Sequence, residues 1–106
     1  MTQTCLVLCN CPDGQTAEAI AHRLVQDQLA ACVNILPEVK SIYRWQDKIE
    51  NALEHTLLIK TTAATYPLLQ TVITELHPYE VPEIIAIPIT QGLPAYLDWI
   101  HENTAP

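Results

Sequence analysis

The hydrophobic positions near the start of the chain change from a continuous run to a helical repeat. Cys5–Cys9 is a short apolar run that ends in a turn cluster, Asn10–Gly14, and it predicts a first strand. Apolar residues then recur every three or four positions, which predicts a helix that buries one face and ends near Ala30. Asp13 precedes this helix and can accept a hydrogen bond from its first free N–H groups. The apolar stripe consists of Ala17, Ile20, Ala21, Leu24 and Val25.

Two longer segments in the middle of the chain are rich in β-branched and aromatic residues. Val33–Trp45 and Ile49–Thr61 both favour extended backbone, and the second alternates polar with apolar residues over part of its length. Gln46–Lys48 separates the two segments and predicts a hairpin turn. Because Pro37 has no backbone N–H to donate, it predicts a kink or an exposed edge in the first of the two strands.

The last third of the chain repeats the helix–strand pattern. Ala63–His77 predicts a second helix whose first turn accommodates Pro67. Ile84–Ile89 predicts a fourth strand, and Pro94 predicts the start of a short third helix. The positions expected to face inward on the second helix are Leu69, Val72, Ile73 and Leu76, and the third helix carries Tyr96, Leu97 and Ile100.

The order of these elements predicts an α+β, ferredoxin-like split βαβ domain over residues 1–106, with an added terminal helix. Right-handed crossovers place both long helices on one face of the sheet. The opposite face of such a sheet normally meets water, so its strands alternate polar with apolar residues. Cys5–Cys9 and Ile84–Ile87 are instead apolar on both faces. We therefore expect another copy of the chain to cover the helix-free face, which makes the protein a homo-oligomer.

Composition and charge narrow the classes of partner. The 106 residues are 49% hydrophobic and 16% charged, which is apolar-rich for a small monomer and agrees with self-association. Twelve acidic residues oppose five basic ones, and no Lys or Arg follows Lys60. Binding to nucleic acid or to an anionic membrane is disfavoured, because both need positive charge. No apolar run reaches the ~20 residues that a membrane-spanning helix needs.

The four cysteines all lie in the first third of the chain, and no basic segment typical of a signal peptide precedes them. We therefore expect a cytoplasmic protein with reduced thiols and no disulfide framework. Cys5 and Cys32 are expected to act as small buried hydrophobes. Cys9 lies at the exit of the first strand. Cys11 lies in the following turn, where we expect it to be exposed.

The predicted topology brings a histidine to the two cysteines at the strand exit. The first and fourth strands lie side by side and antiparallel, so Cys9 and Cys11 meet the connector His77–Glu80 from the far end of the chain. Pro78 and Pro82 stiffen this connector. Thiolate and imidazole suit Cu(I), Cu(II) or Zn(II) rather than Mg or Ca. Because a structural zinc site needs four ligands, we expect transient coordination or ligands shared between subunits.

Each candidate also has a purely structural interpretation. Cys9 can be a small buried hydrophobe, and His77 can cap the carboxyl end of the second helix by binding its last carbonyls. Glu83 can be a buried carboxylate that pairs with Lys60, the last cation of the chain. These interpretations require no ligand.

The remaining aromatic and histidine residues receive simpler interpretations. Tyr43 and Trp45 lie on the long hairpin, and they favour an inter-subunit patch over internal packing because aromatic residues concentrate at interfaces. His22, His55 and His101 have no partner at a ligand-like spacing. They are expected to lie at the surface or to be hydrogen-bonded.

A catalytic function has little support in the sequence. Two glycines in the whole chain leave no Gly-rich phosphate loop. No nucleophile elbow, zincin histidine pair or paired-carboxylate arrangement occurs. Cys9 and His77 could form a nucleophile–base pair, but nothing in the sequence resembles an oxyanion hole. We therefore expect a binding protein rather than an enzyme.

Five segments carry a resemblance to a known family: Leu29–Asn34, Ser41–Trp45, Ile59–Thr62, His77–Glu83 and Tyr96–Ile100. In this order the chain resembles the CutA proteins, called divalent-cation tolerance proteins, over nearly its whole length. The resemblance implies a ferredoxin-like subunit and a tightly packed homotrimer whose long hairpins pair between neighbours. It also implies a role in the tolerance of divalent cations, copper especially.

The resemblance also implies where a metal would bind. In copper-binding relatives the ligand positions fall at the strand-one cysteine, matched here by Cys9, and at two adjacent histidines before Pro-Tyr, of which only His77 is matched. Leu76 stands in place of the other histidine. Cys11 is a substitute donor that we infer independently of the family pattern. We therefore expect a metal site at Cys9, His77 and Cys11, with copper as its ion and other divalent cations as further candidates.

The family's architecture also resembles that of PII signalling trimers, which bind small molecules between subunits. This implies an alternative function, a signalling trimer that holds a small metabolite in its inter-subunit clefts. The residues expected to line such a cleft are Lys60, Tyr79, Glu83, Tyr43 and Trp45.

Overall fold

The computed structural model describes residues 3–105 and shows four strands and three helices in that range. The strands form one antiparallel sheet with the order β2-β3-β1-β4, so the first and last strands in sequence are neighbours. This arrangement confirms the predicted α+β, ferredoxin-like class. The elements are β1 (Thr4–Cys11), α1 (Gly14–Gln26), β2 (Cys32–Trp45), β3 (Lys48–Thr62), α2 (Tyr66–Leu76), β4 (Ile84–Pro88) and α3 (Pro94–Glu102).

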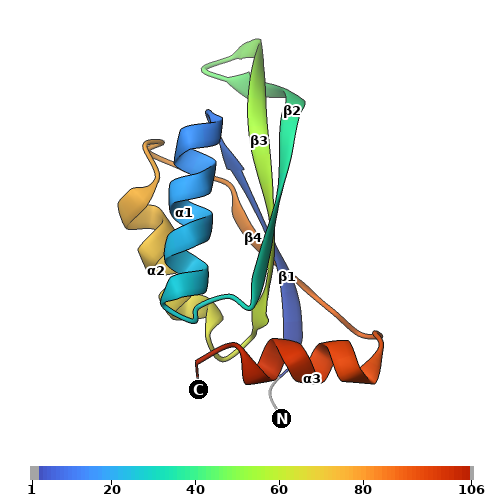
Figure 1. The fold of residues 1–106 in the computed structure, drawn as a ribbon. Coiled ribbons are helices and arrows are strands. Elements are labelled where there is room, and N and C mark those ends of the chain that lie inside the picture. Colours follow the sequence, from blue (N-terminus) through green and yellow to red (C-terminus); the bar gives the residue numbers. More distant parts are fainter. Residues whose placement is uncertain (1–2, 106) are drawn as a thin grey trace.

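Both α1 and α2 cover the same face of the sheet, and α3 lies across the end at which β1 begins (Figure 1). Successive strand side chains point to opposite faces, so alternate residues of β1 are buried beneath the two helices. Within residues 3–105, no helix is both long and apolar enough to cross a bilayer. The fully buried large residues of the core include Val7, Ile20, Leu24, Leu57, Ile59, Leu69 and Ile73.

The strands β2 and β3 form a long hairpin that reaches beyond the helices (Figure 1). Gln46 and Asp47 connect them with φ values of 50° and 64°, the left-handed backbone that a two-residue type I′ turn requires at both positions. The pairing register shifts between Leu36 and Val39, where Pro37 interrupts the edge strand β2. The hairpin turn and the irregularity at Pro37 are therefore both where the sequence predicts them.

Large apolar side chains remain exposed on the helix-free face and on the hairpin. Ile85 and Ile87 of β4 are 49% and 44% exposed, although their strand lies against β1. Ile42, Ile49 and Leu53 on the hairpin are each about two-thirds exposed, at 67%, 69% and 66%. This surface is the one for which the sequence predicts a covering copy of the chain, and the assembly itself stays a prediction.

The ends of the helices differ from the sequence prediction. The helix α1 ends at Gln26, not near Ala30, because Gln28 has a φ of 57° and the next two backbone N–H groups fold back onto the carbonyl of Leu24. Val25 is 44% exposed, so it does not belong to the buried stripe. The capping role of Asp13 is confirmed by the hydrogen bond that its side chain accepts from the N–H of Thr16.

The second helix starts later than predicted. Residues 63–65 form a turn closed by the hydrogen bond from the N–H of Thr65 to the carbonyl of Thr62, and α2 begins at Tyr66. Pro67 lies in the first turn, as predicted. Leu76 does not face the core: it is 39% exposed, because it lies at the last position of the helix, beyond the turn that packs on the sheet.

Candidate metal centre and adjacent cleft

Three possible metal ligands meet at the end of the sheet opposite α3. The donor atoms of Cys9, Cys11 and His77 all lie within 4.8 Å of one another, and all three residues are buried. Cys9 and Cys11 lie at the end of β1, and His77 lies at the carboxyl end of α2. The topology predicted from the sequence brings these two segments together. Within residues 3–105, these three residues are the one group of three or more potential metal-ligating side chains whose donor atoms lie close together.

The strand β1 fixes both sulfur atoms on the helix side of the sheet. Cys9 and Cys11 are two residues apart, so their side chains point to the same face. Cys9 pairs with Leu57 of β3 and with Ile84 of β4, while Cys11 pairs with His55 of β3. The prediction that Cys11 is exposed in a turn is wrong: β1 continues through Cys11, and its side chain has no exposed area.

His77 is held by two backbone hydrogen bonds to its ring. Its Nε2 lies 2.6 Å from the carbonyl oxygen of Asn10, and its Nδ1 accepts the N–H of Tyr79 at 3.1 Å. The ring therefore carries its proton on Nε2 and donates it to the carbonyl. The ring does not bind the last carbonyls of α2, as the capping interpretation proposed; only the backbone N–H of His77 does so, through the carbonyl of Ile73.

This pattern indicates which ring nitrogen is available to a metal. A histidine ligand commonly donates its second N–H to a backbone carbonyl, which fixes its orientation. If Nδ1 of His77 binds the ion, the bond from Nε2–H to Asn10 is kept, and only the weaker bond from Tyr79 is replaced. The alternative, binding through Nε2, would break the shorter bond.

The two thiols are coupled through a hydrogen bond. The S–H of Cys9 donates to the sulfur of Cys11, which raises the pKa of Cys9 and lowers that of Cys11. Burial and the nearby carboxylates of Glu83 and Glu54 raise the pKa of Cys9 further. The pair therefore holds one proton tightly, and a metal ion must displace that proton to bind both sulfurs.

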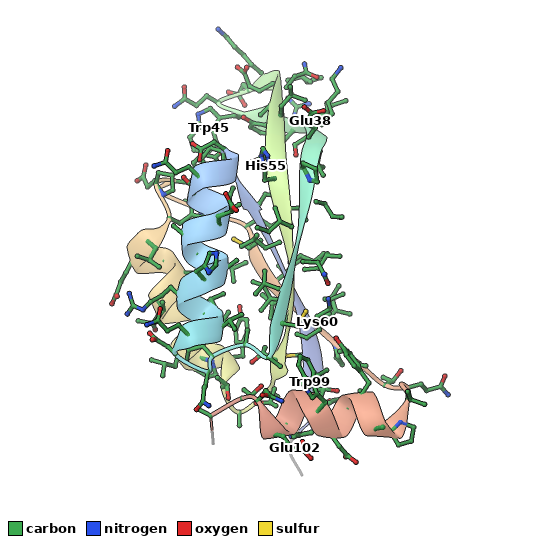
Figure 2. The ribbon with its side chains drawn as sticks, in the orientation of Figure 1. Glu38, Trp45, His55, Lys60, Trp99 and Glu102 are labelled. Carbon is green, nitrogen blue, oxygen red and sulfur yellow. The ribbon has the colours of Figure 1, made fainter. Side chains whose placement is uncertain are left out.

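A cleft of about 540 Å³ lies beside this cluster. Its lining includes four of the five residues expected for a small-molecule cleft: Tyr43, Trp45, Tyr79 and Glu83. Lys60 is not among the lining residues, and Figure 2 shows Trp45 and Lys60 toward opposite ends of the molecule. Within one chain, the structure therefore separates Lys60 from the other four.

The predicted pair between Glu83 and Lys60 is not formed. Glu83 instead accepts a hydrogen bond of 3.3 Å from the side-chain amide of Asn10. Lys60 donates to the side-chain oxygen of Asn34 and lies 3.9 Å from the sulfur of Cys32, its neighbour across the β2–β3 ladder. Lys60 lies on β3 beside the start of β1, whereas Glu83 directly precedes β4 near the end of β1, a separation that spacing along the chain does not reveal.

Two polar residues of the site were not identified from the sequence. Glu54 is only 6% exposed and lines the cleft, where it accepts a hydrogen bond of 3.1 Å from the phenol of Tyr79. His55 was expected to lie at the surface or to be hydrogen-bonded, yet it is half-buried, and its Nδ1 is buried with no partner among residues 3–105. Both lie in the stretch of β3 that the sequence assigned correctly, but burial at a hairpin depends on long-range pairing.

Comparison with known proteins places the chain in a family. The profile described as "CutA1 divalent ion tolerance protein" matches residues 5–103. The divalent-cation tolerance protein CutA of Thermus thermophilus is 50% identical over 99 residues, which cover 93% of this chain and 96% of that protein. The chain spans about half the length of the mouse and human CutA proteins that it also matches.

Solved structures agree with this assignment. The divalent cation tolerance protein (Cut A1) of Thermus thermophilus superimposes with a TM-score of 0.95 at 48% identity, covering 96% of this chain and 99% of that chain. A protein from Archaeoglobus fulgidus, described as a periplasmic divalent cation tolerance protein, has a TM-score of 0.91 at 40% identity and covers 94% of this chain and 97% of that chain. The chain therefore belongs to the CutA1 divalent ion tolerance family.

Proposed function

We propose that this protein binds a soft or borderline metal ion, copper foremost, through Cys9, Cys11 and His77, and acts in metal tolerance as a binding protein rather than an enzyme. One observation supports the proposal above the others: three donor atoms from two distant segments converge within 4.8 Å. Sulfur and imidazole donors favour Cu(I), Cu(II) and Zn(II) over Mg and Ca. The divalent-cation tolerance named for the relatives agrees with this chemistry.

Copper titration of the reduced protein tests the proposal. The double variant Cys9→Ser with His77→Ala removes two of the three donors and should abolish stoichiometric binding. Cys32→Ser with His22→Ala is the matched control, because it removes the same atom types from positions outside the cluster. Equal affinity in the double variant and the control would disprove the metal site.

We also propose that the protein is a homotrimer. The support is the set of exposed large apolar side chains on the helix-free face and the hairpin, which further copies of the chain would cover. Light scattering on the purified protein should give three times the mass of the chain. A folded monomer that persists at nanomolar concentration would contradict this. We also propose a cytoplasmic location, because all four cysteines are free, as is usual in a reducing compartment; cell fractionation can test this.

The cleft supports a second candidate function, the binding of a small organic cation. Glu54 is a buried carboxylate with no cationic partner within residues 3–105, where the one ion pair found joins Arg23 to Asp27. Tyr43, Trp45 and Tyr79 add aromatic rings, whose faces attract cations. Calorimetry with spermidine should show binding that Glu54→Gln removes, whereas absence of heat at millimolar spermidine would disprove this candidate.

A further inference from the structure

One buried nitrogen next to the three-donor cluster has no hydrogen-bond partner. The Nδ1 of His55 is fully buried and unpartnered among residues 3–105. Buried polar atoms in folded proteins are nearly always paired, so such an atom needs a physical reason. A bound metal ion would be one, because an unprotonated ring nitrogen is a metal ligand.

The sheet register places His55 directly beside the cluster. His55 of β3 is the antiparallel partner of Cys11 of β1. Side chains of directly opposed residues leave the same face of the sheet, with Cβ atoms ~5 Å apart. His55 therefore lies on the helix face with Cys9 and Cys11, and Figure 2 shows it on β3 beside the amino-terminal end of α1.

The other end of the His55 ring packs against Gly14. A Cβ at Gly14 would lie 3.4 Å from Nε2 of His55, so the Nε2 edge rests against the start of α1 and Nδ1 is the nitrogen farther from Gly14. His55 is not part of the group whose donor atoms lie within 4.8 Å of one another, so its ring must turn to join them.

We infer that His55 is the fourth ligand, which completes a four-coordinate Cys2His2 site with Cys9, Cys11 and His77 for a divalent ion such as Zn(II). This inference rests on the proposed metal-binding function. Two thiolates and two neutral imidazoles carry two negative charges, which a divalent cation cancels, and a buried site favours such neutrality. Four ligands in this combination are typical of a closed, tetrahedral zinc site, whereas three donors suit monovalent copper.

Co(II) titration of the reduced full chain tests the fourth ligand, because Co(II) reports both sulfur ligation and coordination number in its absorption spectrum. The native protein should show sulfur-to-cobalt charge transfer together with the intense d–d bands of a tetrahedral ion. His55→Ala should keep the charge transfer, lose intensity in the d–d bands and bind at least about tenfold more weakly. His22→Ala, an exposed position on α1, should match the native protein.

A second variant keeps the test decisive if His55→Ala folds poorly. His55→Cys replaces the imidazole with a third sulfur ligand, so its charge-transfer band should exceed that of the native protein. Native-like spectra and affinities in both His55 variants would overturn the inference, while loss of Co(II) binding in Cys9→Ser with His77→Ala would still support the three-donor site. If that double variant binds Co(II) and copper normally, the proposed function itself fails.

Discussion

The phenol of Tyr79 donates a hydrogen bond of 3.1 Å to the carboxylate of Glu54, which β3 buries beside the cleft. Tyr79→Phe leaves this buried carboxylate without its donor and should lower the free energy of unfolding by about 1–3 kcal/mol. Chemical denaturation measures the change. Tyr43→Phe, on the same cleft but with no hydrogen bond recorded for its hydroxyl within residues 3–105, should stay close to the native stability.

The same contact predicts a pH dependence at the alkaline end. Partial burial, and then the hydrogen bond to Glu54, raise the pKa of Tyr79 to about 12 from the usual value of 10.0. The folded state therefore holds this proton more tightly than the unfolded state does. Its contribution to stability is fully present below pH 10 and is lost as the pH rises toward 12. Ultraviolet titration should show a tyrosine that ionises near pH 12 and disappears in Tyr79→Phe.

Metal binding should become stronger as the pH rises. The hydrogen bond to Cys11 raises the pKa of Cys9, so the ion must displace the proton of Cys9 when it binds. We expect at least about one proton to be released per ion. Calorimetry in buffers of different ionisation enthalpy measures the number. Release that is unchanged in Cys9→Ser would show that the proton comes from another group.

The packing beneath the cluster should carry much of the stability. Leu57 pairs with Cys9 across the β1–β3 ladder and is fully buried in the core. Leu57→Ala should therefore cost about 2–5 kcal/mol, since it removes apolar contacts and leaves a cavity. Leu68 is 57% exposed on α2, and Leu68→Ala should change the stability by no more than about 0.5 kcal/mol. Denaturant midpoints of the two variants compare them directly, and equal midpoints would contradict this assignment of the core.

The cap of the first helix should fail in acid. The hydrogen bond from the backbone of Thr16 lowers the pKa of the Asp13 carboxyl below its usual value of 3.8. The stabilisation by the charged cap is present above that value and is lost as the pH falls through the lowered pKa of the folded state. Asp13→Asn keeps a hydrogen-bond acceptor without a charge, so it should remove the acid dependence of helix stability. Circular dichroism between about pH 2 and 6 tests this prediction, with wild-type-like acid sensitivity of Asp13→Asn as the contrary result.

Much of the fold was predictable because its elements are marked locally. Hydrophobic periodicity locates the helices and strands, Asp13 and Pro67 mark helix starts, and Pro37 marks the irregular edge. The topology that follows was enough to bring Cys9 and His77 together.

What the sequence did not reveal depends on pairing between distant strands. Cys11 looks like a turn residue beside Pro12, but β3 pairs with β1 through that position and buries the sulfur. The position of Lys60 far from Glu83, and of His55 opposite Cys11, likewise follows from register, which no short window contains. Local signals therefore locate the elements, and long-range register sets the chemistry of the site.

The irregularity at Pro37 has a consequence for how this molecule meets others. Because β2 is an outer strand, its free N–H and C=O groups could template the addition of further strands. The register shift divides that edge into two short stretches, residues 32–36 and 39–45, whose bonding directions no longer form one line. An incoming strand can match one stretch but not both, so the irregularity at Pro37 limits the addition of further strands along β2.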